Sequence, residues 1–205
     1  MRIVKESIPY IVVPVLLAAA AAALGFWYVA GILFLVALFM AFFFRDPKRE
    51  PPSDPDVVVS PADGKVTRIG PANAAADSPT VVSIFLSPFD VHINRSPIRG
   101  KIVNVLYSPG KFLMATNEKA SLVNEQNALT IQGEKITVVC KQIAGILARR
   151  IVCWKAAGDS LGLGERFGMI KFSSRTDVIL TANVRVTVKE GERVRGGITV
   201  IGRIS

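Results

Sequence analysis

An uncharged apolar stretch near the N-terminus, residues 8–44, constrains the fold of this chain more than any other feature. As a single helix its 37 residues would be about 55 Å long, well beyond a hydrocarbon core of ~30 Å. Two shorter spans fit better, with a bend at Gly25 and with Trp27 and Tyr28 at the level of the lipid headgroups. We therefore predict a membrane-associated helical hairpin over residues 1–44.

The basic residues around this stretch predict its orientation. They lie at its two outer ends and not in its middle: Arg2, Lys5, Arg45, Lys48 and Arg49. By the positive-inside rule both ends face the cytoplasm, so we expect the rest of the chain on the cytoplasmic side of the cell membrane. Two alternatives are a secretory signal cleaved in the alanine tract before Gly25 and a single tilted span. The apolar run resumes after Gly25, which favours the hairpin over a cleaved signal.

The composition also favours association with a membrane. Half of the residues are hydrophobic and the formal net charge is +9. A basic chain suits nucleic acid or an anionic membrane. Because the sequence lacks an aromatic–basic nucleic-acid motif, we expect a membrane and no nucleic acid. Cys140, Cys153 and the single histidine fall short of the four ligands of a structural zinc site, so we expect no metal.

Beyond the apolar stretch the pattern of the sequence changes. A charged, proline-rich segment, residues 45–56, predicts a stiff linker. From residue 57 to residue 205, short runs rich in β-branched residues alternate with Gly, Pro, Asn or Asp. This pattern predicts a mainly β domain, an antiparallel sandwich or barrel. One short helix is expected within residues 111–123. The turn over residues 189–197 is typical of a lipoyl-like sandwich, but no lysine there has the neighbours that a carrier site requires.

A few polar positions are candidates for chemistry. His92 is the single histidine and the only side chain whose ordinary pKa lies near neutrality, which suits proton transfer, although a lone histidine is also commonly structural. Ser173 and Ser174 lie between two strand-like runs, where a serine can attack its own backbone. Asp63 precedes a glycine and by itself indicates a turn. Asp90 is equally suited to holding its own turn.

Several motifs occur in an order that resembles a known family. Arg45-Asp46-Pro47 follows the apolar stretch, Pro61-Ala62-Asp63-Gly64 and Asp90-Val91-His92 come next, and Gly164-Glu165-Arg166-Phe167-Gly168 precedes Ser173-Ser174-Arg175. Together with matches that continue to the C-terminus, they make the chain similar to the short, bacterial and archaeal type of phosphatidylserine decarboxylase proenzyme. One departure lies at the cleavage point, where this chain has serine and the family usually has glycine.

This resemblance implies that the chain cuts itself between Ser173 and Ser174. The Oγ atom of Ser174 adds to the carbonyl of residue 173, the peptide rearranges to an ester, and elimination leaves a pyruvoyl group on residue 174. That group is the implied covalent cofactor, and the cleaved subunits, the smaller being residues 174–205, remain together as a heterodimer. The resemblance assigns Asp63 to orienting His92 and to helping activate Ser174.

The resemblance also implies the reaction. Phosphatidylserine would be converted to phosphatidylethanolamine, a step of phospholipid biosynthesis, through a Schiff base between the substrate amine and the pyruvoyl ketone. His92 is then expected to protonate the α-carbon. Longer members carry a second histidine where this chain has Arg95. Either His92 serves both cleavage and decarboxylation, or Arg95 assists by its charge.

Two other functions stay open at this stage. One is a non-enzymatic membrane adaptor, in which the hairpin anchors a lipoyl-like domain and Ser173-Ser174 is an ordinary turn. The other is a decarboxylase of a different serine lipid. The sequence assigns no headgroup-binding residues and leaves the oligomeric state open, a homo-oligomer included.

Overall fold

The computed structural model describes residues 2–73, 78–114, 120–146, 150–171, 174–181 and 183–205. The chain divides into two compact units, Met1–Lys48 and Arg49–Ser205. Ser173, one of the two residues at the predicted cleavage point, lies outside the described residues.

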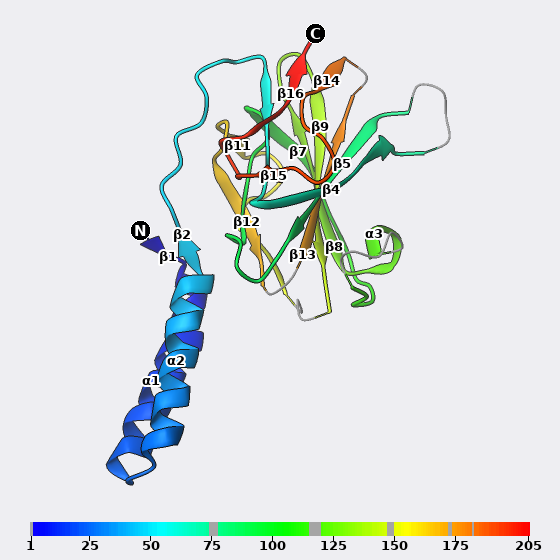
Figure 1. Ribbon diagram of the computed structural model, residues 1–205. Coiled ribbons are helices and arrows are strands. Elements are labelled where there is room, and N and C mark those ends of the chain that lie inside the picture. Colours follow the sequence, from blue (N-terminus) through cyan, green and yellow to red (C-terminus); the bar gives the residue numbers. More distant parts are fainter. Residues whose placement is uncertain (1, 74–77, 115–119, 147–149, 172–173, 182) are drawn as a thin grey trace. The chain divides into compact units, whose positions relative to one another are not determined.

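The first unit is built on two apolar helices (Figure 1). A short 3-10 turn, η1 (Lys5–Ser7), leads into α1 (Ile8–Ala23), and α2 (Trp27–Phe43) follows a turn at Gly25. The φ angle of Gly25 is +82°, a conformation that glycine adopts without a steric penalty. The two ends of the unit meet where β1 (Arg2–Ile3) pairs antiparallel with β2 (Arg45–Asp46). The unit is therefore a helical hairpin with the bend where the sequence predicts it.

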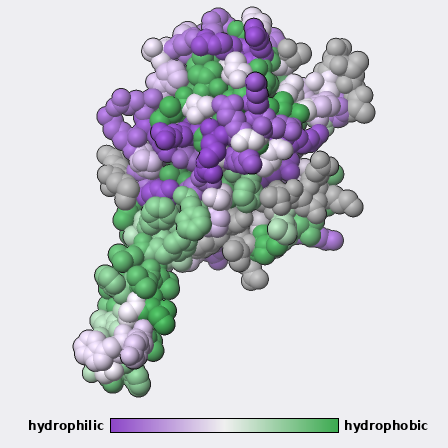
Figure 2. Space-filling view, in the orientation of Figure 1, coloured by the Kyte–Doolittle hydropathy of each residue, from purple (hydrophilic) through white to green (hydrophobic). Residues whose placement is uncertain are grey.

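Small side chains are buried along the length of this hairpin, whereas most of its large apolar side chains are exposed, apart from Phe43 and Phe44 at its end. Ala18, Ala30 and Ala37 are buried, and alanine at such positions lets two helices approach closely. The outer surface is hydrophobic over most of its length (Figure 2). Among the described residues, the helical segment Lys5–Ala23 is long and apolar enough to cross a membrane, and Trp27–Phe43 is a shorter apolar helix.

The second unit is mainly β and antiparallel, as predicted. Its largest sheet has eight strands, in the spatial order β11 (Ser160–Leu161), β7 (Gly100–Ser108), β8 (Gln126–Gln132), β9 (Thr137–Ala144), β13 (Ser174–Leu180), β5 (Thr80–Leu86), β4 (Gly64–Pro71) and β15 (Arg193–Val194). The sheet curls strongly (Figure 1). Within the stretch where a helix is expected, the described residues contain α3 (Ala120–Val123).

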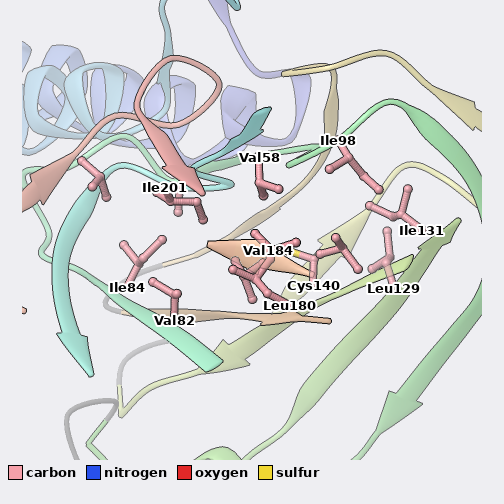
Figure 3. Packing of buried hydrophobic residues seen from close by; sticks show 14 of the residues in the cluster. Val58, Val82, Ile84, Ile98, Leu129, Ile131, Cys140, Leu180, Val184 and Ile201 are labelled. Atoms are coloured by element: carbon pink, nitrogen blue, oxygen red, sulfur yellow. The ribbon is translucent and has the colours of Figure 1, made fainter. Parts of the chain in front are cut away.

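Two smaller sheets complete the unit. One has the order β10 (Ile151–Cys153), β12 (Arg166–Ile170) and β6 (Ile93–Arg95), and the other β14 (Val184–Val186), β16 (Val200–Ile204) and β3 (Val57–Val59). Side chains from all three sheets share one hydrophobic core, in which Val58, Ile84, Leu129, Cys140 and Ile201 converge (Figure 3). The unit is thus a curled main sheet covered on its inner face by shorter strands.

The strands form because apolar residues recur at every second position. In β8 and β9 the buried positions alternate with less buried ones, so that Leu129 and Ile131 face the core beside Cys140 and Val138. Strand β13 differs because it pairs with β5 on one side and β9 on the other, and nearly all of its residues are buried. Its first residue, Ser174, therefore lies within the sheet and not at its edge.

Candidate active site

Ser174 opens β13 and lies opposite Leu86 of β5 and Ala144 of β9. The residue is fully buried, and its Oγ atom has no hydrogen-bond partner among the described residues. Burying a hydroxyl without a partner costs free energy, so such an atom in a well-packed sheet calls for an explanation. Self-cleavage chemistry at this atom is one explanation, because a nucleophile must keep its oxygen available.

His92 immediately precedes β6 and is 1% exposed. Its main-chain oxygen accepts a hydrogen bond from the Ile170 amide at 3.2 Å, and Ile170 ends β12, four residues before Ser174. The Nδ1 atom of His92 lies 2.9 Å from the carbonyl oxygen of Asp90. A carbonyl can only accept, so Nδ1 carries the proton in this contact and the neutral ring keeps its lone pair on Nε2. This is the tautomer of a general base that acts through Nε2.

Asp63 is held by a cation and by a backbone amide. Its Oδ2 atom accepts a hydrogen bond from Arg49 at 2.7 Å, and its Oδ1 atom accepts one from the Gly196 amide at 2.7 Å. Burial raises the pKa of Asp63, and the nearby Asp90 charge adds to this, while Arg49 and the Gly196 amide act in the opposite direction. The carboxylate is therefore desolvated and depends on Arg49 for its counter-charge.

The hydrogen bonds described for the predicted residues differ from the expected triad pattern. The carboxylate of Asp63 accepts from Arg49 and Gly196, and the Nδ1 atom of His92 contacts the Asp90 carbonyl. Asp90 holds its own turn, because its Oδ2 atom accepts hydrogen bonds from the amide and the hydroxyl of Ser87 at 2.9 and 2.8 Å. Its other oxygen pairs with Arg193. In the hydrogen bonds described, His92 is thus held by the Asp90 turn, and Asp63 is held separately by Arg49 and Gly196.

Arg95, which stands where longer members have a second histidine, is buried in the same region. Its guanidinium donates to the Gly164 carbonyl at 3.2 Å, and its amide donates to the Pro61 carbonyl at 2.8 Å. Arg95 therefore ties the segment before Asp63 to the loop that precedes β12.

A buried amide network lies on the same face of β13 as Ser174. Thr176, two residues on, accepts a hydrogen bond from Asn94 at 3.0 Å. Asn94 in turn accepts from Gln142 at 2.9 Å, and Gln142 accepts from Asn127 at 3.1 Å. The network joins strands β6, β8, β9 and β13, and connected buried hydrogen bonds of this kind hold a site rigid.

The opposite face of β13 carries a buried ion pair. Arg175 donates to Asp177 through Nε at 2.6 Å and through Nη2 at 2.9 Å, and it also donates to the Ser83 hydroxyl at 3.0 Å. Both charged side chains are at most 5% exposed. The backbone that follows Ser174 is therefore anchored on both of its faces.

Sequence reasoning missed Arg49, Asn94 and Gln142. Arg49 counts in the sequence only as a basic flank of the apolar stretch, and the two amides carry no local signal. No group of three His, Cys, Asp or Glu side chains that could hold a metal is found in the described part of the chain. A pocket lined mainly by residues 51–56, 98–100 and 132–136 contains none of the candidate residues, so it is separate from this site.

Comparison with known proteins gives the family. A family model described as phosphatidylserine decarboxylase matches residues 36–202. A phosphatidylserine decarboxylase proenzyme of Solibacter usitatus is 50% identical over 208 residues, which cover 99% of this chain and 97% of the relative. The proenzymes of Chlorobium chlorochromatii and Geotalea uraniireducens are 45% and 42% identical, over 86% and 98% of this chain and 84% and 95% of their own. The chain therefore belongs to the phosphatidylserine decarboxylase family.

Proposed function

We propose that this chain converts phosphatidylserine to phosphatidylethanolamine in phospholipid biosynthesis, and that it is made as a proenzyme that cuts itself between residues 173 and 174. The observation that carries the proposal is the Oγ atom of Ser174, buried at the start of a central strand without a hydrogen-bond partner among the described residues. An ordinary turn serine would point its hydroxyl to water. Family membership supports this enzyme over a non-enzymatic adaptor.

Self-cleavage needs only atoms of the chain and one water. The Ser174 hydroxyl gives its proton to a base and adds to the carbonyl of residue 173. The C–N bond then breaks and the nitrogen takes up that proton, which leaves an ester and a free amine on residue 174. Loss of the Ser174 α-proton expels the residue 173 carboxylate and leaves a carbon–carbon double bond. Water then releases ammonia and leaves a ketone at the new N-terminus.

The pyruvoyl group would be formed from the atoms of Ser174 itself, so β5 and β9 on its two sides would hold it. The buried position without a described partner fits a group that has lost the amine and hydroxyl of serine. When present, this group supplies the carbonyl that accepts electrons as carbon dioxide leaves.

His92 is the residue proposed to move protons at this site. Its contact with the Asp90 carbonyl favours the tautomer in which Nε2 is the base, and its backbone holds Ile170 of the strand that leads to Ser174. The same imidazole, once protonated, would return a proton to the α-carbon of the substrate. Asp63 keeps the proposed role of supporting His92, which the resemblance to the family implies.

The proposed setting is the cytoplasmic side of the cell membrane. The apolar helices α1 and α2 would anchor the chain, and basic residues at both ends of the hairpin support the cytoplasmic orientation. A phospholipid substrate could then reach the site while its acyl chains stay in the bilayer.

The test is the intact mass of the purified full chain under denaturing conditions, before and after incubation at neutral pH. We expect two fragments divided at 173/174, the smaller lighter by one ammonia than its serine-started peptide and reactive with hydroxylamine. Ser174→Ala should give a single uncut chain, and Ser160→Ala, at an exposed position on β11, should be cut normally. His92→Asn should slow cleavage.

Two further measurements complete the test. The cleaved chain should release carbon dioxide from phosphatidylserine vesicles, and hydroxylamine should abolish this release. Ser173→Gly should be cut faster than the parent, because glycine relieves crowding at the scissile carbonyl. If the parent and Ser173→Gly both remain uncut, self-processing is wrong and the membrane adaptor becomes the better explanation.

A further inference from the structure

The second unit exposes an apolar surface next to the candidate active site. Five hydrophobic side chains make up this surface: Phe112, Met114, Leu122, Val123 and Ile146. Leu122 is 79% exposed and Met114 is 61% exposed, although side chains of this size are normally covered in a domain with a large core. Hydrophobic residues are visible along the lower edge of this unit (Figure 2).

Hydrogen bonds connect this surface to the strand end that carries Ser174. Asn124, directly after α3, is buried and bonds to both the amide and the carbonyl of Leu113 at 2.9 Å. Its Nδ2 atom also donates to the carbonyl of Ala144 at 2.7 Å, and Ala144 is the residue of β9 that lies opposite Ser174. Asn124 therefore connects the apolar surface to Ala144, the strand neighbour of the predicted nucleophile Ser174.

Exposed basic residues flank the surface. Lys111 is exposed beside Phe112, and its amide and carbonyl bond to Val123 and Glu125 at 2.7 and 3.0 Å. Arg150 is exposed four residues after Ile146 in the chain, and its carbonyl accepts from the Lys171 amide at 3.2 Å. Apolar side chains bordered by cations match the interface of an anionic membrane, where the hydrocarbon takes the former and the headgroups attract the latter.

We propose that this apolar surface docks the second unit into the anionic face of the bilayer, so that the mouth of the active site opens at the level of the lipid headgroups. The inference rests on the proposed function in taking a bilayer phospholipid as the substrate. A bilayer is the occupant to expect because the same chain carries the apolar helices α1 and α2, which keep the second unit tethered near lipid. The hairpin would then anchor the chain, and this surface would orient the site.

The direct test measures contact with lipid and needs no activity. Tryptophan is placed at residue 122 in the full chain with Trp27→Phe and Trp154→Phe, and the protein is reconstituted in phosphatidylglycerol vesicles with and without brominated acyl chains. Leu122→Trp fluorescence should fall severalfold in the brominated vesicles, and the matched control Val103→Trp, at an exposed position on β7, should not change. Equal fluorescence of Leu122→Trp in both vesicles overturns the proposal. It is the result expected if a second copy or the chain's own hairpin covers the surface and keeps residue 122 away from the acyl chains.

The contribution of charge is tested in the same vesicles. Replacing phosphatidylglycerol by zwitterionic phosphatidylcholine should weaken the quenching of Leu122→Trp, and Lys111→Glu with Arg150→Glu should weaken it further in the anionic vesicles. If neither change alters the quenching, the proposed preference for anionic headgroups is wrong.

A functional test separates docking from catalysis. Leu122→Asp should lower turnover of long-chain phosphatidylserine in the bilayer about tenfold, as expected for losing one leucine side chain that inserts into the bilayer. It should leave unchanged the turnover of a short-chain phosphatidylserine that stays monomeric in water. Equal activity of Leu122→Asp and the parent on the bilayer substrate refutes docking. Absence of turnover on both substrates by the parent refutes the proposed function instead, and the fluorescence test still decides docking.

Discussion

Replacing Asp177 by asparagine should destabilise the second unit strongly. The Arg175 and Asp177 side chains are 4% and 5% exposed, and two hydrogen bonds of 2.6 and 2.9 Å join them. Asparagine keeps the shape of the side chain but leaves the guanidinium buried without a counter-charge. Breaking a buried pair in this way costs about 3–5 kcal/mol, a large part of the ~5–15 kcal/mol that stabilises a typical domain.

The assay is urea unfolding of the full chain carrying Ser174→Ala, which keeps the polypeptide uncut on the present hypothesis. With a slope of about 2 kcal/mol per molar urea, the midpoint should fall by roughly 2 M. The control is Lys135→Ala. The ion pair of Lys135 with Asp56 is nearly as short, 2.7 Å, but its side chains are 59% and 42% exposed. The midpoint should therefore hardly move, because water screens the pair.

A second variant removes both charges. Arg175→Met with Asp177→Leu should recover most of the lost stability, because no unpaired charge is then left in the interior. If Asp177→Asn and Lys135→Ala shift the midpoint equally, burial does not set the strength of these pairs. If the double variant is no better than Asp177→Asn, the loss comes from packing and not from the orphaned charge.

Three further predictions concern Arg49, Cys140 and Gly168. Arg49→Gln should move the acid limb of the cleavage rate to higher pH, because burial already raises the pKa of Asp63 and Arg49 is the main group that opposes this rise. An unchanged pH profile would contradict a role for the Asp63 carboxylate. Cys140, fully buried and with its pKa raised by that burial, should resist alkylation until urea unfolds the chain, as counted by mass spectrometry. Gly168→Ala should lower both the urea midpoint and the cleavage rate, because the added methyl carbon would lie 2.3 Å from the carbonyl oxygen of Val152. A midpoint and a rate equal to those of the parent would show that β10 can move aside.

The helical hairpin and the β-rich character could be predicted because both are local. An uncharged run of this length has few alternatives to helices, and a glycine near its middle, Gly25, can adopt the positive φ of a tight turn. Alternation of apolar residues fixes which face of β8 or β9 is buried, because successive side chains of a strand point to opposite sides. The order of the strands could not be predicted, because no local pattern in the sequence places β13 between β5 and β9.

The candidate residues could be chosen from motifs, but their partners could not. Asp63, His92 and Ser174 are candidates because their sequence neighbourhoods resemble those of a family, and the family is confirmed. Their proposed roles stay predictions. Arg49, which pairs with Asp63, lies in a segment that reads as a linker, and Asn94 reaches Thr176 across 82 residues of chain.

The sequence alone determined the apolar hairpin, the antiparallel β character and the chemical groups available near the predicted cleavage point. Only the tertiary structure decided that Ser174 is buried between two strands, that the Asp90 carbonyl holds His92, and that Arg49 neutralises Asp63. The physical reason is one of range. Periodicity follows from the fixed geometry of neighbouring residues, whereas hydrogen-bond partners and desolvation depend on which distant segments pack together.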